Sequence, residues 1–211
     1  MGGELRPRPI VVPQGSAPQC WAAATTSWLQ LNKSRPQLNK QQLLDRYGDP
    51  NKGGSLGHAS PKWDTYCSDL NLVVSEVRTL LDIEGWKQKA AKENPSRPPL
   101  TPGEAVALFN AQAKKFADST LGFLSNKGYG LFMFAHTHSR LRGTISHMVV
   151  LFGVHRVDGE PNLIVMDPAK AAIRDLPMSE IFNIPIVILS TREARTPKDL
   201  PVAVGVPSED T

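Results

Sequence analysis

Apolar positions recur at helical intervals through the first 125 residues. The Ala-rich stretch Cys20–Leu31 and the amphipathic stretch Gln37–Tyr47 each have the spacing of a helix that buries one face. Ser60–Leu70 predicts another short helix, and an apolar stripe predicts a long one from Pro102 to about Ser125. The long stretch opens with Thr-Pro-Gly-Glu, the order of a capped helix start. We therefore expect the N-terminal half to be mainly helical.

From Gly130 onward, apolar residues come in short unbroken runs, which is the pattern of buried strands. An Asp-Gly pair between two of these runs, beginning at Asp158, predicts a tight hairpin turn. Asn71–Val77 fits either a strand or a continued helix, because its period does not distinguish them. The sequence thus predicts an α+β fold with a helical N-terminal half packed against a C-terminal antiparallel sheet. The predicted strands are Leu131–Ala135, His147–His155, Asn162–Asp167 and Ile184–Leu189.

Proline-rich segments mark the expected boundaries. Asn94–Pro102 is the stretch densest in proline and predicts the division between the two halves. Arg6–Pro13 is too rich in proline for an internal strand and is expected to be an extended edge segment or arm. We expect one domain over residues 1–195, with a helical half (1–125) and a β half (126–195). The polar residues 196–211 are expected to form a loosely held, flexible extension.

Composition and charge exclude several classes of function. The net charge of +4 is spread along 211 residues without a basic aromatic patch, so we expect no nucleic-acid partner. No apolar run is long enough to span a bilayer, and the N-terminus has no apolar core of a secretory signal. A soluble chain made in the cytoplasm, with no membrane partner, is expected. Two cysteines cannot form a disulfide framework, and Cys67 is interpreted as a buried free thiol.

Cys20 is the first candidate for chemistry, because it begins a predicted helix six residues after Gln14. The thiolate is the reactive form of cysteine, and the N–H groups and dipole at a helix N-terminus favour it. For an arbitrary cysteine, a small buried apolar residue is the better interpretation. The glutamine in front of the helix favours a nucleophile here, with Gln14 as the oxyanion donor and Trp21 packed against the site wall.

A thiol nucleophile needs a base and a group that orients the base. His147 begins an apolar strand, and the hairpin returns the chain to Asp167, so the two are expected to be neighbours in an antiparallel ribbon. Asp167 follows four apolar residues, where an unpaired carboxylate is costly. Taken alone, the two residues would be an ordinary strand-end histidine and a turn aspartate. Together with Cys20 they predict a Cys-His-Asp triad.

The other histidines carry weaker signals. His58 lies in a glycine-rich loop, where a solvated side chain is the default, and His155 ends a strand. His136 and His138 would point to one face of a continued strand, as metal ligands can. Since no carboxylate or thiol accompanies them, the sequence predicts no metal site and no cofactor.

Two short blocks resemble papain-like cysteine peptidases. Gln14–Trp21 is similar to the Gln-x5-Cys-Trp motif of that superfamily. His147–Val154 is similar to the segment His-Ala-Val-x-x-x-Gly-Tyr, with Val154 where tyrosine is usual. Asp167-Pro168 replaces the Asn-Ser-Trp of plant and animal enzymes and resembles the bacterial branch, which includes staphopains, bacteriocin-leader peptidases and effector peptidases of plant pathogens. Trp21 differs from the leader peptidases, which usually have glycine after the cysteine.

The resemblance implies a cleft between the two halves, with Cys20, His147 and Asp167 as the triad and Gln14 in the oxyanion hole. It implies hydrolysis of peptide or isopeptide bonds in a protein or peptide substrate. Deamidation, transamidation and ubiquitin-like deconjugation use the same triad, and a vestigial toxin-like or effector binding module is a further alternative. No pro-segment is recognisable before Cys20, so we expect either a mature fragment or an enzyme that is restrained in some other way. A bacterial origin is expected, and export by a dedicated secretion system toward a target-cell protein stays open.

Overall fold

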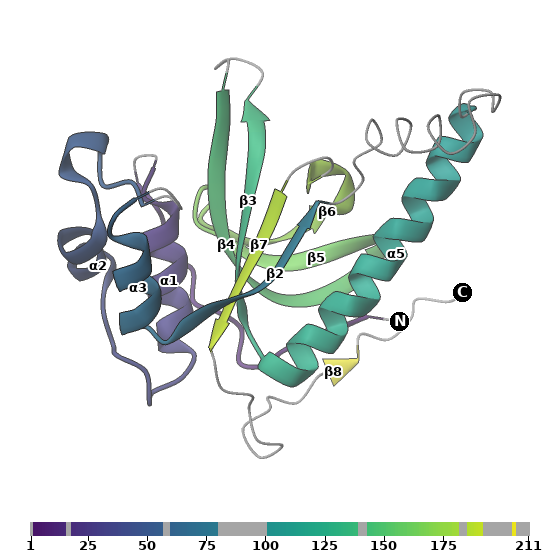
Figure 1. The fold of residues 1–211 in the computed structure, drawn as a ribbon. Helices are drawn as coiled ribbons and strands as arrows, with labels where there is room; N and C mark the ends of the chain where they lie inside the picture. The colour runs from purple at the N-terminus through teal and green to yellow at the C-terminus, as the bar shows by residue number, and fades with distance from the viewer. Residues whose placement is uncertain are drawn as a thin grey trace.

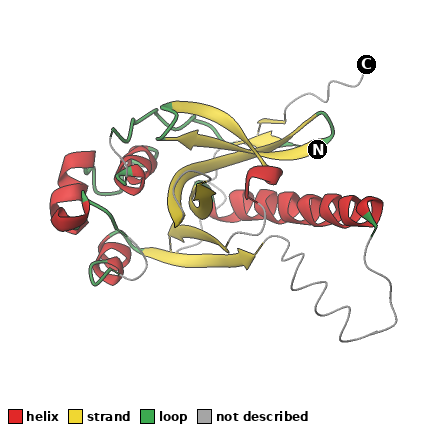
Figure 2. Ribbon diagram, turned by 90° about the horizontal axis from the view of Figure 1, so that it is seen from above, coloured by secondary structure: helices red, strands yellow, loops and turns green. Residues whose placement is uncertain are grey.

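The computed structural model describes residues 2–15, 18–56, 60–79, 101–138, 143–181, 185–191 and 204–205. These residues form an α+β fold in which helices stand on two sides of a twisted antiparallel sheet (Figures 1 and 2). Three helices gather on one side, and a long one runs along the other. The first three are α1 (Cys20–Gln30), α2 (Lys40–Tyr47) and α3 (Trp63–Asp69), with the short 3-10 turn η1 (Pro50–Lys52) between α2 and α3, and the long helix is α5 (Pro102–Lys127).

The sheet has eight strands in the described residues, and the pairings between them are antiparallel. Its main path runs in the order β2-β7-β3-β4-β1-β8, and β5 branches from β4 and carries β6 on its far edge. The strands are β1 (Gly3–Glu4), β2 (Leu72–Thr79), β3 (Gly130–His138), β4 (Gly143–Val157), β5 (Glu160–Asp167), β6 (Ala172–Pro177), β7 (Pro185–Thr191) and β8 (Val204–Gly205).

The long strand β4 organises this sheet. Its 15 residues pair with β3 and then β1 along one edge, and with β5 along the other. The turn between β4 and β5 is the predicted hairpin, and Asp158 (φ 50°) and Gly159 (φ 81°) both have the positive φ that a two-residue turn of this kind requires. The prediction of a tight turn at the Asp-Gly pair is therefore confirmed.

Helix α1 lies between the sheet and the other N-terminal helices, and every residue from Cys20 to Leu29 is buried. Its alanines let the helix approach the sheet closely, and several of its polar side chains are hydrogen-bonded. Trp28 Nε1 donates to the Tyr129 carbonyl (3.0 Å), and the Thr25 hydroxyl lies 2.7 Å from the Tyr66 hydroxyl. An aromatic cluster joins α1 to α2 and α3, and it consists of Trp21, Tyr47, Trp63 and Tyr66.

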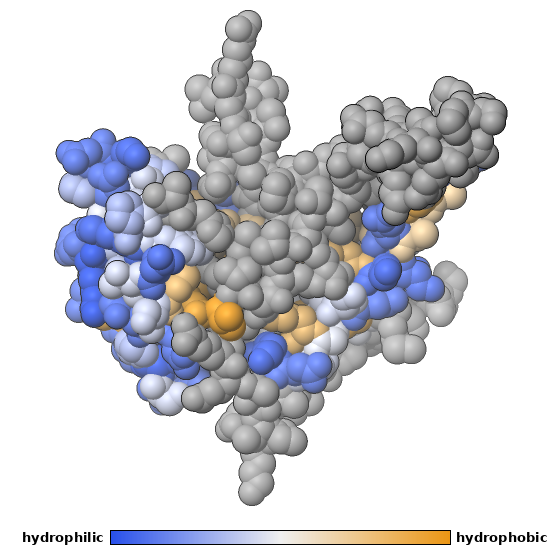
Figure 3. Space-filling model, viewed as in Figure 1, coloured by the Kyte–Doolittle hydropathy of each residue, from blue (hydrophilic) through white to orange (hydrophobic). Residues whose placement is uncertain are grey.

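The helical side is hydrophilic on its outer surface, as Figure 3 shows. Only Leu43 and Tyr47 of α2 are buried, so most of that helix faces solvent. Among the described residues, no helix combines the length and the apolar character that crossing a membrane requires.

The capping signals in the sequence place the helix starts well. The long helix begins at Pro102 after the Thr101 cap, and Glu104 completes a capping box as predicted. Helix α2 begins at Lys40, three residues later than predicted, because Asn39 forms a capping box of its own with Gln42.

The sheet differs from the predictions in several places. The ambiguous run Asn71–Val77 lies in strand β2 from Leu72 onward, so the N-terminal half also contributes to the sheet. Strand β6 and the 3-10 turn η2 (Met178–Ile181) were not predicted. Val204–Gly205, in the predicted loose extension, pairs with β1. The predicted boundary at Asn94–Pro102 lies largely outside the described residues, and the single domain over residues 1–195 stays a prediction.

Candidate active site

Cys20 is the first residue of α1, at the end of the helix whose N–H groups have no intrahelical partners. In the described chain, the first turn of α1 has no acidic side chain and Gln19 provides no side-chain cap. Neither the first turn nor the Gln19 side chain therefore competes with a negative charge on the thiol for the positive end of this helix. The residue is 7% exposed, so the thiol lies just below the surface.

His147 reaches this thiol from β4. Its Nε2 donates a hydrogen bond to Asp167 Oδ1 (2.8 Å), and its ring is also hydrogen-bonded to the Cys20 side chain. Because Asp167 engages Nε2, Nδ1 is the ring nitrogen left for the thiol. Burial alone would lower the pKa of His147, but the hydrogen bonds and charges of Asp167 and Cys20 outweigh it and raise the pKa to about 9. The arrangement favours a protonated ring at neutral pH.

Asp167 ends β5 and is 1% exposed, yet each carboxylate oxygen has partners. Oδ1 accepts from the backbone N–H of Ala169 (2.9 Å) as well as from His147, and Oδ2 accepts from Arg174 Nε (2.8 Å). Burial opposes the charge, but the hydrogen bonds and charges of His147 and Arg174 hold the pKa of Asp167 well below its usual range. The buried carboxylate is therefore ionised and paired, as the sequence predicts.

A β-bulge puts Asp167 and His147 on the same face of the sheet. From the hairpin to Gly153↔Ile164 the pairing register is constant, and it then shifts by one residue so that Val150 pairs with Met166. Side chains alternate along a strand, so Asp167 points to the face opposite Met166, as does His147 relative to Val150. Without the shift, Asp167 would point away from His147. The hairpin reasoning that predicted these neighbours did not include the bulge.

Gly153, at the bulge, was a signal in the sequence for this irregularity. A Cβ on Gly153 would lie 2.8 Å from Ile164 Cδ1 and 2.9 Å from the Gly3 carbonyl oxygen. Strands β1 and β5 therefore approach β4 too closely at this point for any side chain to fit without a shift.

Gln14 is tied to the triad through its backbone. Its N–H donates to the Pro168 carbonyl (3.1 Å), one residue after Asp167, and its own carbonyl accepts from Lys40 Nζ (3.0 Å). The next residue, Gly15, has a φ of 76°, which glycine adopts without strain. The side-chain Oε1 of Gln14 is buried and has no hydrogen-bond partner in the described residues. The predicted oxyanion residue therefore lies beside the strand end that carries Asp167.

Trp21 packs into the helical cluster. Its indole Nε1 donates to the Gly54 carbonyl (2.9 Å), and its ring stands edge-on to Tyr66 at 5.6 Å between centroids. These contacts belong to the core of the helical side, and a role at the site wall stays a prediction. Cys67 was predicted to be buried but is half-buried, and both it and Cys20 are free thiols.

Of the remaining histidines, the structure describes the side chain of His155, which contacts Asp175. His155 Nε2 lies 2.6 Å from Asp175 Oδ1, a close contact without hydrogen-bond geometry. His58 and the side chains of His136 and His138 lie outside the described residues. Among the residues that the structure describes, no three His, Cys, Asp or Glu side chains gather as metal ligands would.

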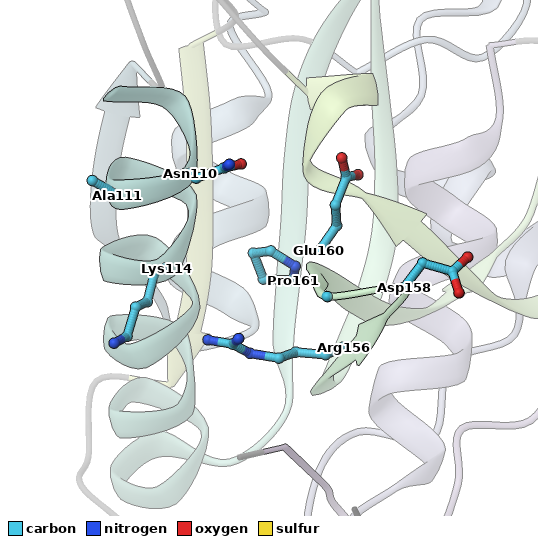
Figure 4. Close-up of a pocket in the computed structure, with 8 residues that line it drawn as sticks. Asn110, Ala111, Lys114, Arg156, Asp158, Glu160 and Pro161 are labelled. Atoms are coloured by element: carbon cyan, nitrogen blue, oxygen red, sulfur yellow. The ribbon is translucent and has the colours of Figure 1, made fainter. Parts of the chain in front are cut away.

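An open cleft of about 530 Å³ lies elsewhere, between α5 and the β4–β5 turn (Figure 4). Lys114 of α5, Arg156 of β4, Asp158 and Glu160 are among the residues that line it. No triad residue lines this cleft, and it has no thiol, hydroxyl or imidazole. The lining of this cleft therefore offers no nucleophile of the kind expected at Cys20.

A scan against models of protein families and a search of curated proteins find no match to this chain.

Sequence reasoning missed two residues at the site. Lys40 holds the carbonyls of Pro13 (3.3 Å) and Gln14, and Arg174 holds Asp167. Neither had a local signal, because each acts on a segment distant in the sequence and β6 itself was not predicted. The assembled site can form a thiolate–imidazolium pair beside a charged carboxylate, which is the equipment of acyl transfer through a thioester.

Proposed function

We propose that the protein is a papain-like cysteine peptidase of the bacterial type, which hydrolyses peptide or isopeptide bonds. The observation that carries the proposal is the hydrogen-bonded series from Cys20 through His147 to Asp167. The two sequence blocks that resemble this superfamily are the ones that contribute these three residues. The antiparallel sheet facing a helix that begins with the cysteine agrees with a papain-like fold, which is part of the proposal.

In this mechanism His147 accepts the Cys20 proton, and the thiolate attacks the carbonyl carbon of the scissile bond. The oxyanion that forms is held by the Cys20 backbone N–H and the Gln14 side-chain amide, whose buried Oε1 leaves Nε2 as the donor. Each such donor contributes about 3 kcal/mol to transition-state stabilisation in comparable sites.

The tetrahedral intermediate then collapses. The C–N bond breaks, His147 gives its proton to the leaving amine, and a thioester on Cys20 remains. Water, deprotonated by His147, attacks the thioester, and the released acid restores the Cys20–His147 pair. Asp167 keeps its hydrogen bond to Nε2 throughout, which fixes the ring so that Nδ1 faces the sulfur.

Labelling with a peptidyl epoxide, which alkylates active-site thiols, tests the assignment. We expect one adduct, mapped by mass spectrometry to Cys20, and loss of hydrolysis of an unstructured protein such as casein. Cys20→Ser should have no activity, and Cys67→Ser is the matched control that should keep it. Labelling at Cys67 alone, or hydrolysis by Cys20→Ser, would rule the proposal out.

The same experiment separates the alternative chemistries. Analysis of the products by mass distinguishes peptide-bond hydrolysis from replacement of ammonia by water and from incorporation of an amine. The triad also serves those reactions, so the leaving group and the acceptor together decide the class. A Cys20→Ala protein that keeps its full biological effect would favour the binding-module alternative. The proposal includes a protein or peptide as the substrate and delivery of the enzyme to a target cell.

A further inference from the structure

The charge network of the site extends beyond the triad to Arg174 and Glu180. Arg174 of β6 donates from Nε to Asp167 Oδ2 (2.8 Å), on the side of the carboxylate away from His147. Its Nη1 and Nη2 each lie 3.2 Å from Glu180 Oε2, in η2, and Nη1 also donates to the Asp175 carbonyl (3.2 Å). The guanidinium is thus fixed at both ends, between a buried carboxylate and an exposed one.

The two oxygens of Asp167 have different tasks. Oδ1 accepts from His147, from Ala169 N–H (2.9 Å) and, at 3.4 Å, from Lys170 N–H, whereas Oδ2 accepts from Arg174. The backbone of the turn therefore holds the carboxylate in place without help from Arg174. What Arg174 adds is a positive charge that offsets part of the His147–Asp167 interaction.

The groups around His147 show why that charge matters. Cys20 from α1 and Asp167 from β5 are titratable groups that hydrogen-bond to the ring, and Phe134 is the position opposite His147 in the backbone register of β3 with β4. On the other side of Asp167, Arg174 binds the carboxylate, and Glu180 in turn binds Arg174. A buried carboxylate with no other counter-ion binds the imidazolium proton tightly, and a ring that holds its proton too tightly is a poor acid for the leaving amine.

We propose that Arg174 is a positioning residue that acts through Asp167, where it limits the negative charge facing His147 and so sets the upper pH limit of the Cys20–His147 pair. This inference rests on the proposed function for its kinetic consequence but not for its electrostatic one. Glu180 modulates it in the opposite direction, because its charge partly cancels that of Arg174.

Two measurements test the proposal in full-length protein with Cys67 replaced by Ser. The first follows the His147 ring by NMR in isotope-labelled protein, with the signal assigned from a His147→Gln variant. The second follows the alkaline limb of kcat/KM for a peptide substrate. If the chain hydrolyses no peptide, the NMR titration still decides the role of Arg174, so the two proposals fail separately.

For Arg174→Gln we expect the His147 midpoint and the alkaline limb to rise together by about one pH unit, the usual size of the effect of a neighbouring charge. Arg174→Lys, which keeps the charge, should stay near the wild type. Glu180→Gln alters a side chain that is 52% exposed and should fold normally. It should move both quantities down by a smaller amount, and less at high salt.

An unchanged His147 midpoint in Arg174→Gln would overturn the proposal. A lowered midpoint would also overturn it, because it would mean that Arg174 only holds Asp167 in place. If Arg174→Gln does not fold, a Glu180→Gln midpoint equal to or above that of the wild type would overturn the proposal instead.

Discussion

Replacing Asp167 with asparagine keeps the shape of a side chain that is buried and removes its charge. No orientation of the amide suits the site. Where its NH2 group takes the place of Oδ1, it meets the N–H of Ala169, and where it takes the place of Oδ2, it meets Arg174 Nε. Both neighbours are donors, so one buried donor loses its partner in either orientation. The asparagine side chain therefore cannot substitute for the carboxylate as a neutral orienter of His147.

The charge itself has a larger effect. His147 is 8% exposed, and its pKa rises from 6.5 to about 9 on folding, which corresponds to about 3 kcal/mol. Because the folded pKa is the higher one, this stabilisation is complete below pH 6.5 and is lost as the pH rises through 9. The lowered pKa of Asp167 arises largely from the same interaction with His147, so the free energy of the pair is counted only once.

Asp167→Asn should therefore lower the free energy of unfolding by about 3–5 kcal/mol near pH 6, as breaking a buried ion pair does. The loss should shrink by up to about 3 kcal/mol by about pH 9.5, where the wild-type ring is neutral. Urea unfolding followed by tryptophan fluorescence at both pH values measures it. Asp167→Asn combined with Arg174→Gln is the matched control, since the glutamine gives the amide an acceptor and should restore part of the loss.

A loss of equal size at both pH values would refute the reasoning, because it would show that the His147–Asp167 pair does not change its charge in this range. An Asp167→Asn protein as stable as the wild type near pH 6 would refute it as well. Peptide hydrolysis by this variant should fall by roughly 10⁴-fold at neutral pH, the effect of the same change in a serine-peptidase triad.

Three further perturbations test the surroundings of the site. Gly153→Ala should lower the free energy of unfolding by about 1–3 kcal/mol in urea, since the new Cβ would press on the backbone of β1. Lys40→Met should reduce peptide hydrolysis about tenfold by loosening Gln14, while a small alkylating reagent still reacts with Cys20 at the wild-type rate. Tyr66→Phe should cost about 1–2 kcal/mol of stability, because it breaks the hydrogen bond between the buried hydroxyls of Thr25 on α1 and Tyr66 on α3.

For each of these three variants, one result would contradict the prediction. A Gly153→Ala protein with wild-type stability would mean that β1 moves aside freely. Slower alkylation of Cys20 in Lys40→Met would mean that Lys40 acts on the thiol and not on the Gln14 segment. Tyr66→Phe without loss of stability would mean that the Trp21 carbonyl, which accepts from the Thr25 hydroxyl (2.7 Å), satisfies that hydroxyl alone.

Local signals in the sequence predicted much of the fold because they act over a few residues. The start of α5 followed from its capping box, and the turn at Asp158 followed from the positive φ that an Asp-Gly pair tolerates. Strand β6 escaped because Arg174 and Asp175 interrupt its apolar positions, and only Leu176 in it is fully buried. An edge strand of this kind has no buried periodicity to detect.

The triad could be predicted only in part, since its geometry depends on a feature that no motif encodes. A two-residue hairpin without irregularity would pair Asp167 with Val150, and their side chains would point away from His147. Phe152 is the extra residue in β4, and it shifts the pairing of β4 with the end of β5 by one residue. Asp167 and His147 therefore lie on the same face of the sheet. Gly153 makes the bulge compatible with the close approach of β1, so the N-terminal strand helps to hold the register on which the site depends. A side chain at Gly153 should thus disturb the His147–Asp167 contact as well as the stability of the sheet.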